Sequence, residues 1–401
     1  MYLTKDEQRI LDGEQGAVKA KLMHILVAMG DIYSADRLVP ITSAHISGVS
    51  YKTIGDTGLD FLKDFTGGVK FAVKTTINPC GMDLINWKSQ NIDENFAKKQ
   101  IEIVELFKNT GALTSYTCTP YLYLNRPKFG DHISWGESSA VCFANSVIGA
   151  RTNREGGPGA LAAAAFGKTA NYGFHLDEHR KADFLVNIKA KLKSPVDYGI
   201  VGRIVGSLTS GIPYFRGISI SNTDEIMMKY LSAALAVGSI AMFQIEGVTP
   251  ENNTDIKDRV DIDEKDMENF KKEYFSSGPG CPGSPGSTSG SGEVPDLIAY
   301  GCPHASIDEI REIASLVEGK KLPCDFWLCT SREAKKIADD ENLTGIIEKS
   351  GGKVLCDTCM VVAPIEGFAG SVFTNSAKAL YYLNTLCGAK TKMIYTGDLC
   401  K

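Results

Sequence analysis

Three segments that carry cysteines contain the residue types best able to hold a metal cofactor. Cys302 follows the apolar run DLIAYG, Cys356 and Cys359 follow KVL, and Cys118 lies in a strand-like stretch just before Pro120. In open α/β sheets, ligands collect beyond the carboxyl ends of the strands, so thiolates from distant parts of the chain could meet there. Three thiolates leave one iron of a cubane without a protein ligand, and such an iron can act as a Lewis acid in a dehydration.

Other roles for these cysteines stay open at this point. A structural zinc site normally shows a second ligand pair with similar spacing, and we find none in the sequence. A redox pair of the thioredoxin type should open a helix after a strand, whereas CDTCMVVAP runs into an apolar stretch and a proline. Taken one at a time, each cysteine is best explained as a small buried hydrophobic residue.

Several further motifs have the composition of anion-binding segments. GARTNREGGPGAL brings Arg151 and Arg154 together beside a glycine pair, so guanidinium groups and backbone N–H groups could hold a carboxylate or a phosphate. SWGESSAVCFANSV begins a helix with Glu137 and Ser138 in its first turn. The alternatives are a solvated loop for the arginines and an ordinary helix cap for the second motif.

The same reasoning applies to three other turns. TNSAKALYYL places Ser376 at the start of a helix with Lys378 close behind, a combination that binds anions readily and that is equally typical of a capped amphipathic helix. The turns AHISGVS and NPCGMD each follow an apolar run and could bring backbone groups close to a ligand. Their candidate residues are Gly48, Val49, Ser50, Asn78 and Pro79.

The elements that must position these residues alternate between strand and helix, which predicts an α/β fold. We predict a helix over 93–109, a strand over 112–123, and in the C-terminal half a βαβ arrangement with helices from Ser306, Arg332 and Asn375. Residues 276–293 are rich in Gly, Pro and Ser and predict a flexible loop. We treat 1–401 as one catalytic region built of several α/β subdomains.

Composition excludes several classes of function. The chain has 401 residues, 43% of them hydrophobic, and a formal net charge of -5, so we expect no nucleic-acid partner. Because the sequence has no long apolar run, we expect no membrane span and no secretion signal. We therefore expect a cytoplasmic protein. Eleven cysteines at irregular intervals do not form a secreted disulfide framework.

The motifs AHISGVS, NPCGMD, TCTPY, GESSAVCFANSVIGARTNREGGPGAL, GCPHAS, DTCMVVAPI and TNSAKALYY together resemble the large, catalytic subunit of the aconitase X family. The resemblance covers nearly the whole chain apart from the Gly/Pro/Ser-rich loop. It implies an aconitase-like fold without the mobile swivel domain, which we expect as a separate small subunit that supplies a serine base. One departure is Cys80, where we expect a small apolar residue in NPxGMD.

Matched motif by motif, the resemblance implies that Cys118, Cys302 and Cys359 bind an iron–sulfur cluster, with Cys356 as a neighbour. We expect this cluster to be 4Fe-4S with one open iron. It implies catalytic roles for Glu137 and Ser138. The expected substrate contacts are Gly48, Val49, Ser50, Asn78, Pro79, Arg151, Arg154, Ser376 and Lys378.

The activity that the resemblance implies is a hydro-lyase acting in a heterodimer. Archaeal members with separate subunits dehydrate (R)-5-phosphomevalonate to trans-anhydromevalonate 5-phosphate in the mevalonate pathway of isoprenoid biosynthesis. Relatives that dehydrate cis-3-hydroxy-L-proline supply the main alternative. An alternative of another class is a non-catalytic metal-binding or scaffold subunit.

Overall fold

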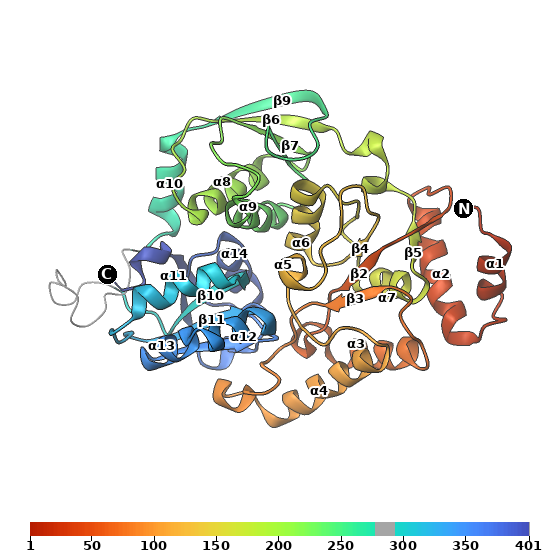
Figure 1. Ribbon diagram of the computed structural model, residues 1–401, viewed down its shortest axis with the longest axis horizontal. Coiled ribbons are helices and arrows are strands. Elements are labelled where there is room, and N and C mark those ends of the chain that lie inside the picture. The colour runs from red at the N-terminus through yellow and green to blue at the C-terminus, as the bar shows by residue number, and fades with distance from the viewer. Residues whose placement is uncertain (277–292, 401) are drawn as a thin grey trace.

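The computed structural model describes residues 1–276 and 293–400, which form three α/β parts around a shared centre (Figure 1). The flexible loop predicted over 276–293 lies outside these residues except for its two end positions. No helix among the described residues is long and apolar enough to cross a membrane.

The first part is built on a parallel three-stranded sheet in the order β3-β2-β4. Its strands are β2 (Ser43–Ile46), β3 (Lys74–Ile77) and β4 (Ser134–Trp135), and a short antiparallel pair, β1 (Leu38–Pro40) with β5 (Lys168–Ala170), stands apart. Its helices are α1 (Lys5–Leu11), α2 (Ala17–Ile32), α3 (Tyr51–Thr66), α4 (Glu94–Asn109), α5 (Pro120–Tyr123), α6 (Ser138–Phe143) and α7 (Gly157–Phe166).

The second part is a parallel sheet in the order β8-β7-β6-β9, which lies at the top of Figure 1. Its strands are β6 (Ala182–Ile188), β7 (Pro213–Arg216), β8 (Gln244–Ile245) and β9 (Thr254–Ile262), and its helices are α8 (Pro195–Leu208), α9 (Glu225–Val237) and α10 (Glu264–Tyr274). Its apolar core continues into α6 of the first part through Val141 and Phe143, so the two parts share one buried interior.

The third part is a parallel five-stranded sheet in the order β12-β11-β10-β13-β14. Its strands are β10 (Leu297–Ala305), β11 (Asp325–Thr330), β12 (Gly352–Cys356), β13 (Ser371–Thr374) and β14 (Lys390–Met393), and its helices are α11 (Ile307–Val317), α12 (Arg332–Asp340), α13 (Leu343–Lys349) and α14 (Ala377–Leu386). Successive residues of β10 enter two different cores, Leu297 one and Ile298 the other, because side chains alternate across a sheet that is covered on both faces.

The third sheet confirms the predicted βαβ half of the chain. Ser306 caps α11, Ser331 caps α12 and Ser376 caps α14, each by accepting a hydrogen bond from a backbone N–H in the first turn. The helix predicted over 93–109 is α4, which Asp93 caps.

The strand predicted over 112–123 is wrong. Only Tyr116 pairs with a neighbouring strand, in an isolated bridge to Ile77, and the segment then turns into α5 at Pro120. Proline fixes a backbone angle suited to the first turn of a helix and lacks the N–H that a strand would need, so the apolar character of this stretch reflects burial rather than a sheet.

Candidate active site

The carboxyl ends of two parallel sheets face each other across one pocket of about 190 Å³. From the first sheet, Ser47 follows β2, Asn78 and Pro79 follow β3, and Gly136, Glu137 and Ser138 follow β4. From the third sheet come Cys302 in the second half of β10, Cys359 beyond β12, and Lys378 in α14 after β13.

The three predicted thiol ligands all line this pocket. Cys118, Cys302 and Cys359 are 6%, 6% and 7% exposed, whereas Cys80 and Cys356 are fully buried and are not part of the lining. Burial raises the pKa of Cys302 to about 12, with a further increase from the neighbouring Cys359 that Lys378 opposes. The three thiols therefore meet in one pocket although they lie far apart in the sequence.

A local distortion of β10 carries Cys302 to the pocket. The pairing of β10 with β11 shifts register between Tyr300 and Ala305, and Gly301 within the shift has a φ of 92°. A Cβ at Gly301 would collide with the backbone carbonyl of Cys329 on β11, so only glycine fits this close approach. The shift lies where the strand order reverses, the position at which open α/β sheets bind ligands.

The turn that carries Cys359 is fixed from the first part of the chain. The backbone N–H of Cys80 donates to the carbonyl of Asp357 over 2.7 Å, and Cys80 forms an isolated bridge with Thr358. The Cys80 thiol donates to the same carbonyl over 3.1 Å. The unexpected Cys80 therefore lies under the Cys359 turn and does not enter the pocket.

A buried ion pair joins the two sides of the pocket. Lys378 Nζ donates to Glu137 Oε1, while Glu137 Oε2 accepts from the backbone N–H of Ala140 at 2.6 Å and from Ser139 Oγ at 2.7 Å. Burial alone would raise the pKa of Glu137, but the charge of Lys378 and these hydrogen bonds lower it to about 2. Glu137 is thus the N-cap of α6 and also an ionised carboxylate in the pocket.

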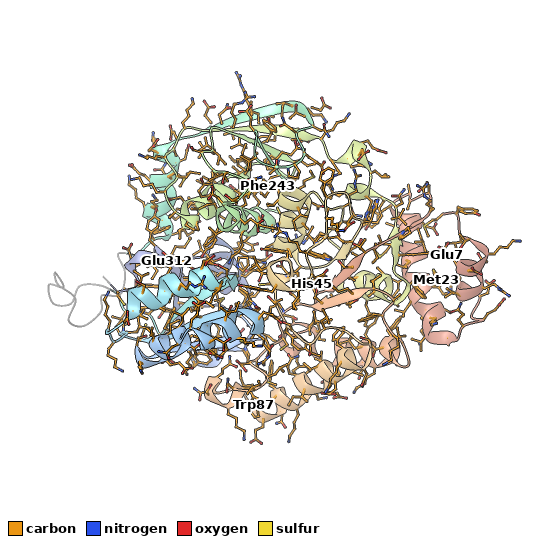
Figure 2. All side chains as sticks on the ribbon, viewed as in Figure 1. Glu7, Met23, His45, Trp87, Phe243 and Glu312 are labelled. Atoms are coloured by element: carbon orange, nitrogen blue, oxygen red, sulfur yellow. The ribbon has the colours of Figure 1, made fainter. Side chains whose placement is uncertain are left out.

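One lining residue retains unused binding capacity. Arg154 is exposed, and no carboxylate pairs with it in the part of the chain that the structure describes. Asn78 also lines the pocket, and its side chain faces His45, which lies on β2 near the middle of the molecule in Figure 2 and is not part of the lining.

The structure places the remaining predicted contacts outside the lining. Arg151 pairs with Asp177 and donates to the carbonyl of His175, so its guanidinium turns away from the pocket. Ser50 Oγ donates to the carbonyl of Val362 over 2.8 Å, and this hydrogen bond holds the pocket-lining residue Val362 in place. Gly48 and Val49 follow the lining residue Ser47.

Ser376 also acts behind the lining. Its Oγ donates to the carbonyl of Cys302 and accepts from the N–H of Ala379, so it ties the start of α14 to the Cys302 turn. Sequence reasoning did not select Ser47, Gly136, Val361, Val362, Tyr382 and Leu386 as lining residues. The position of Ser47 and Gly136 directly after parallel strands was a usable signal, because ligands collect at such ends.

The donor set fits an iron–sulfur cluster. Lys378 lowers the pKa of all three thiols against the effect of burial, and the backbone N–H of His304 donates to Cys118 Sγ over 3.2 Å. Positive charge and N–H donors stabilise thiolate sulfur. Among residues 1–276 and 293–400, no group of His, Cys, Asp or Glu is arranged to hold a single ion. A cubane differs from a single ion because each thiolate binds a separate iron.

The fold and the site define an α/β protein with a thiol-lined pocket between the carboxyl ends of parallel sheets. Sequence models of the aconitase X first, second and third domains match residues 1–178, 182–272 and 295–401. The chain belongs to the aconitase X family.

Individual relatives agree with this assignment. The chain is 49% identical over 410 residues to the phosphomevalonate dehydratase large subunit of Methanocaldococcus jannaschii, covering 100% of this chain and 98% of that protein. It is 30% identical to the cis-3-hydroxy-L-proline dehydratase of Hypocrea jecorina, covering 100% of this chain and 67% of that protein. The crystal structure of Thermococcus kodakaraensis aconitase X in its holo-form superposes with a TM-score of 0.89 at 44% identity, covering 100% and 99% of the two chains. The expected aconitase-like α/β fold is confirmed, and the described residues include no swivel domain.

Proposed function

We propose that this chain is the large subunit of a phosphomevalonate dehydratase, which removes water from (R)-5-phosphomevalonate to give trans-anhydromevalonate 5-phosphate. The observation that carries the proposal is the meeting, in one pocket, of three thiols, an ionised Glu137–Lys378 pair and an arginine without a carboxylate partner among the described residues. The full-length similarity to proteins of that name supports it.

Cys118, Cys302 and Cys359 would hold the cluster. When bound, the cluster supplies Lewis acidity that weakens the C–O bond of the leaving hydroxyl. Because Lys378, Ser139 and the Ala140 N–H occupy both oxygens of Glu137, this carboxylate would orient the substrate together with Ser138 and would not remove its proton. We assign the base to a small subunit, which the words "large subunit" in the relative's name support.

Arg154 and Lys378 would hold the anionic ends of the substrate, and Asn78 would lie beside it in the pocket lining. Anchoring both ends fixes the orientation of the bonds that break, which is a large part of the rate advantage of a bound reactant. Arg151 and Ser376 are left with positioning roles, because both are engaged outside the lining. The cytoplasm is the proposed location, which the free thiols of the pocket residues Cys118, Cys302 and Cys359 support.

The test is an anaerobic assay of the chain reconstituted with iron, sulfide and the corresponding small subunit. We expect turnover of (R)-5-phosphomevalonate and less than about 1% of that rate with cis-3-hydroxy-L-proline, because a site built to bind a charged group discriminates strongly against a ligand that lacks it. Turnover of cis-3-hydroxy-L-proline alone would show that it, and not phosphomevalonate, is the substrate. Absence of iron, sulfide and turnover would favour the non-catalytic scaffold.

A further inference from the structure

One histidine uses all of its polar groups to join the segments that carry the three thiols. His304 lies two residues after Cys302 and is fully buried. Its backbone N–H donates to Cys118 Sγ over 3.2 Å, its ring Nδ1 lies 3.1 Å from Thr117 Oγ1, and its ring Nε2 lies 2.8 Å from the carbonyl oxygen of Thr358. Thr117 and Thr358 directly precede Cys118 and Cys359.

The direction of each hydrogen bond follows from the chemistry of the partners. A carbonyl oxygen only accepts, so Nε2 carries the proton and donates to Thr358. Nδ1 is then an acceptor, and the Thr117 hydroxyl donates to it. Thr117 Oγ1 in turn accepts from the backbone N–H of Thr119 over 3.1 Å, so the hydroxyl is used both as donor and as acceptor. A satisfied buried network holds its members in one arrangement.

The fourth polar group of His304 is held from the second part of the molecule. Lys229, on α9, donates from Nζ to the carbonyl of His304 over 2.9 Å and forms a buried ion pair with Glu309. His304 therefore bonds to residues in all three regions that match aconitase X domains, since Thr117, Lys229 and Thr358 each lie in a different one.

We propose that His304 is the positioning residue that sets the relative placement of Cys118, Cys302 and Cys359 before the cluster is bound. The inference rests on the proposed function, in which these thiols are the cluster ligands. Its ring bridges the Cys118 and Cys359 segments, and its backbone continues from Cys302. A change to the ring should therefore loosen one thiol segment at a time, according to which nitrogen is lost.

The experiment separates the two ring nitrogens. The side chain of His304→Asn retains a polar atom near the Nδ1 position and loses the reach to Thr358, whereas His304→Gln retains the reach to Thr358 and loses the acceptor for Thr117. Thr117→Val removes the hydroxyl that donates to Nδ1 and leaves His304 itself unchanged. His175→Asn is the matched control, because His175 is also buried but bonds to His132 instead.

The first readout is hydrogen exchange in the metal-free chain, followed by mass spectrometry. For His304→Asn we expect about tenfold faster exchange in the 356–361 segment with 115–119 unchanged, and the reverse for His304→Gln and Thr117→Val. For the control we expect neither change. The second readout is iron and sulfide per chain after anaerobic reconstitution, which should fall at least twofold in the three test variants.

Equally accelerated exchange of both segments in the test variants, or wild-type exchange rates in all variants, would overturn the role of His304. So would wild-type iron and sulfide contents in the three test variants. A wild-type chain that binds no cluster would instead overturn the proposed function, and the exchange pattern of the metal-free chain would still decide the role of His304.

Discussion

Lys378 and Glu137 form an ion pair across the pocket although 241 residues separate them in the sequence. Both side chains are almost fully buried, and each belongs to the first turn or the cap of a helix that follows a parallel strand. The pair joins the first part of the chain to the third, so it serves the stability of the fold as well as the chemistry of the pocket.

Lys378→Met should therefore weaken the protein and its activity together. Removing the ammonium leaves the Glu137 carboxylate buried without its partner, which typically costs about 3–5 kcal/mol. We expect a loss of that size in the free energy of unfolding, measured by denaturant titration, and about a 100-fold loss in kcat/KM. Combining Lys378→Met with Glu137→Gln should recover part of the stability but not the activity. Equal stability of the single and double variants would contradict a coupled pair.

The cysteines should divide into two groups by their effect on the cluster. Cys118→Ser, Cys302→Ser and Cys359→Ser are expected to lose most iron and sulfide after anaerobic reconstitution, because each removes a ligand from the pocket. Cys356→Ser is the matched control, since its side chain is fully buried outside the lining. Loss of cluster in Cys356→Ser with retention in Cys359→Ser would exchange the two assignments.

Arg154→Leu should act on substrate affinity. Arg154 lines the pocket without a carboxylate partner among the described residues, so we expect its loss to raise KM for phosphomevalonate at least tenfold, the effect of losing a hydrogen bond to a charged group. Arg126→Leu is the control, because Arg126 pairs with Glu225 outside the pocket. Steady-state kinetics on both variants gives the comparison. A larger increase in KM from Arg151→Leu than from Arg154→Leu would show that the pocket geometry misassigns the anion contact.

Glu155 should make stability fall as the pH rises. Burial raises the pKa of this carboxyl to about 7, and hydrogen bonding to Thr169 opposes that effect. The folded state therefore holds a proton that the unfolded state releases near pH 4.5. The resulting stability is fully present below about pH 4.5 and is lost as the pH rises to about 7.

Glu155→Gln should remove this dependence. Between pH 5 and pH 8 the wild-type chain should lose up to about 3 kcal/mol more than the variant, as a pKa shift of this size implies. Denaturant unfolding at the two pH values measures the difference. The same slope in both proteins would show that Glu155 is ionised in the fold throughout this range.

Much of the third part could be read from the sequence because its signals are local. DFWLCT and the turn residues after it predict a strand followed by a capped helix, and β11 and α12 form there with Ser331 as the cap. Proline at 120 was an equally local signal that the 112–123 segment does not continue as a strand, but the apolar residues around it outweighed it in the prediction.

The sequence by itself determined which residues stand at the ends of the strands, and therefore which thiols, carboxylates and cations were available. Strand and helix boundaries depend on neighbours a few residues away, so the order of residues along the chain was enough to place Glu137 and Lys378 at such boundaries. Only the tertiary structure decided which of these residues meet. It turned Arg151 toward Asp177 and placed His304 between Cys118 and the Cys359 turn. The contacts of His304 join segments more than 50 residues apart through the packing of the sheets, and no local spacing specifies that packing.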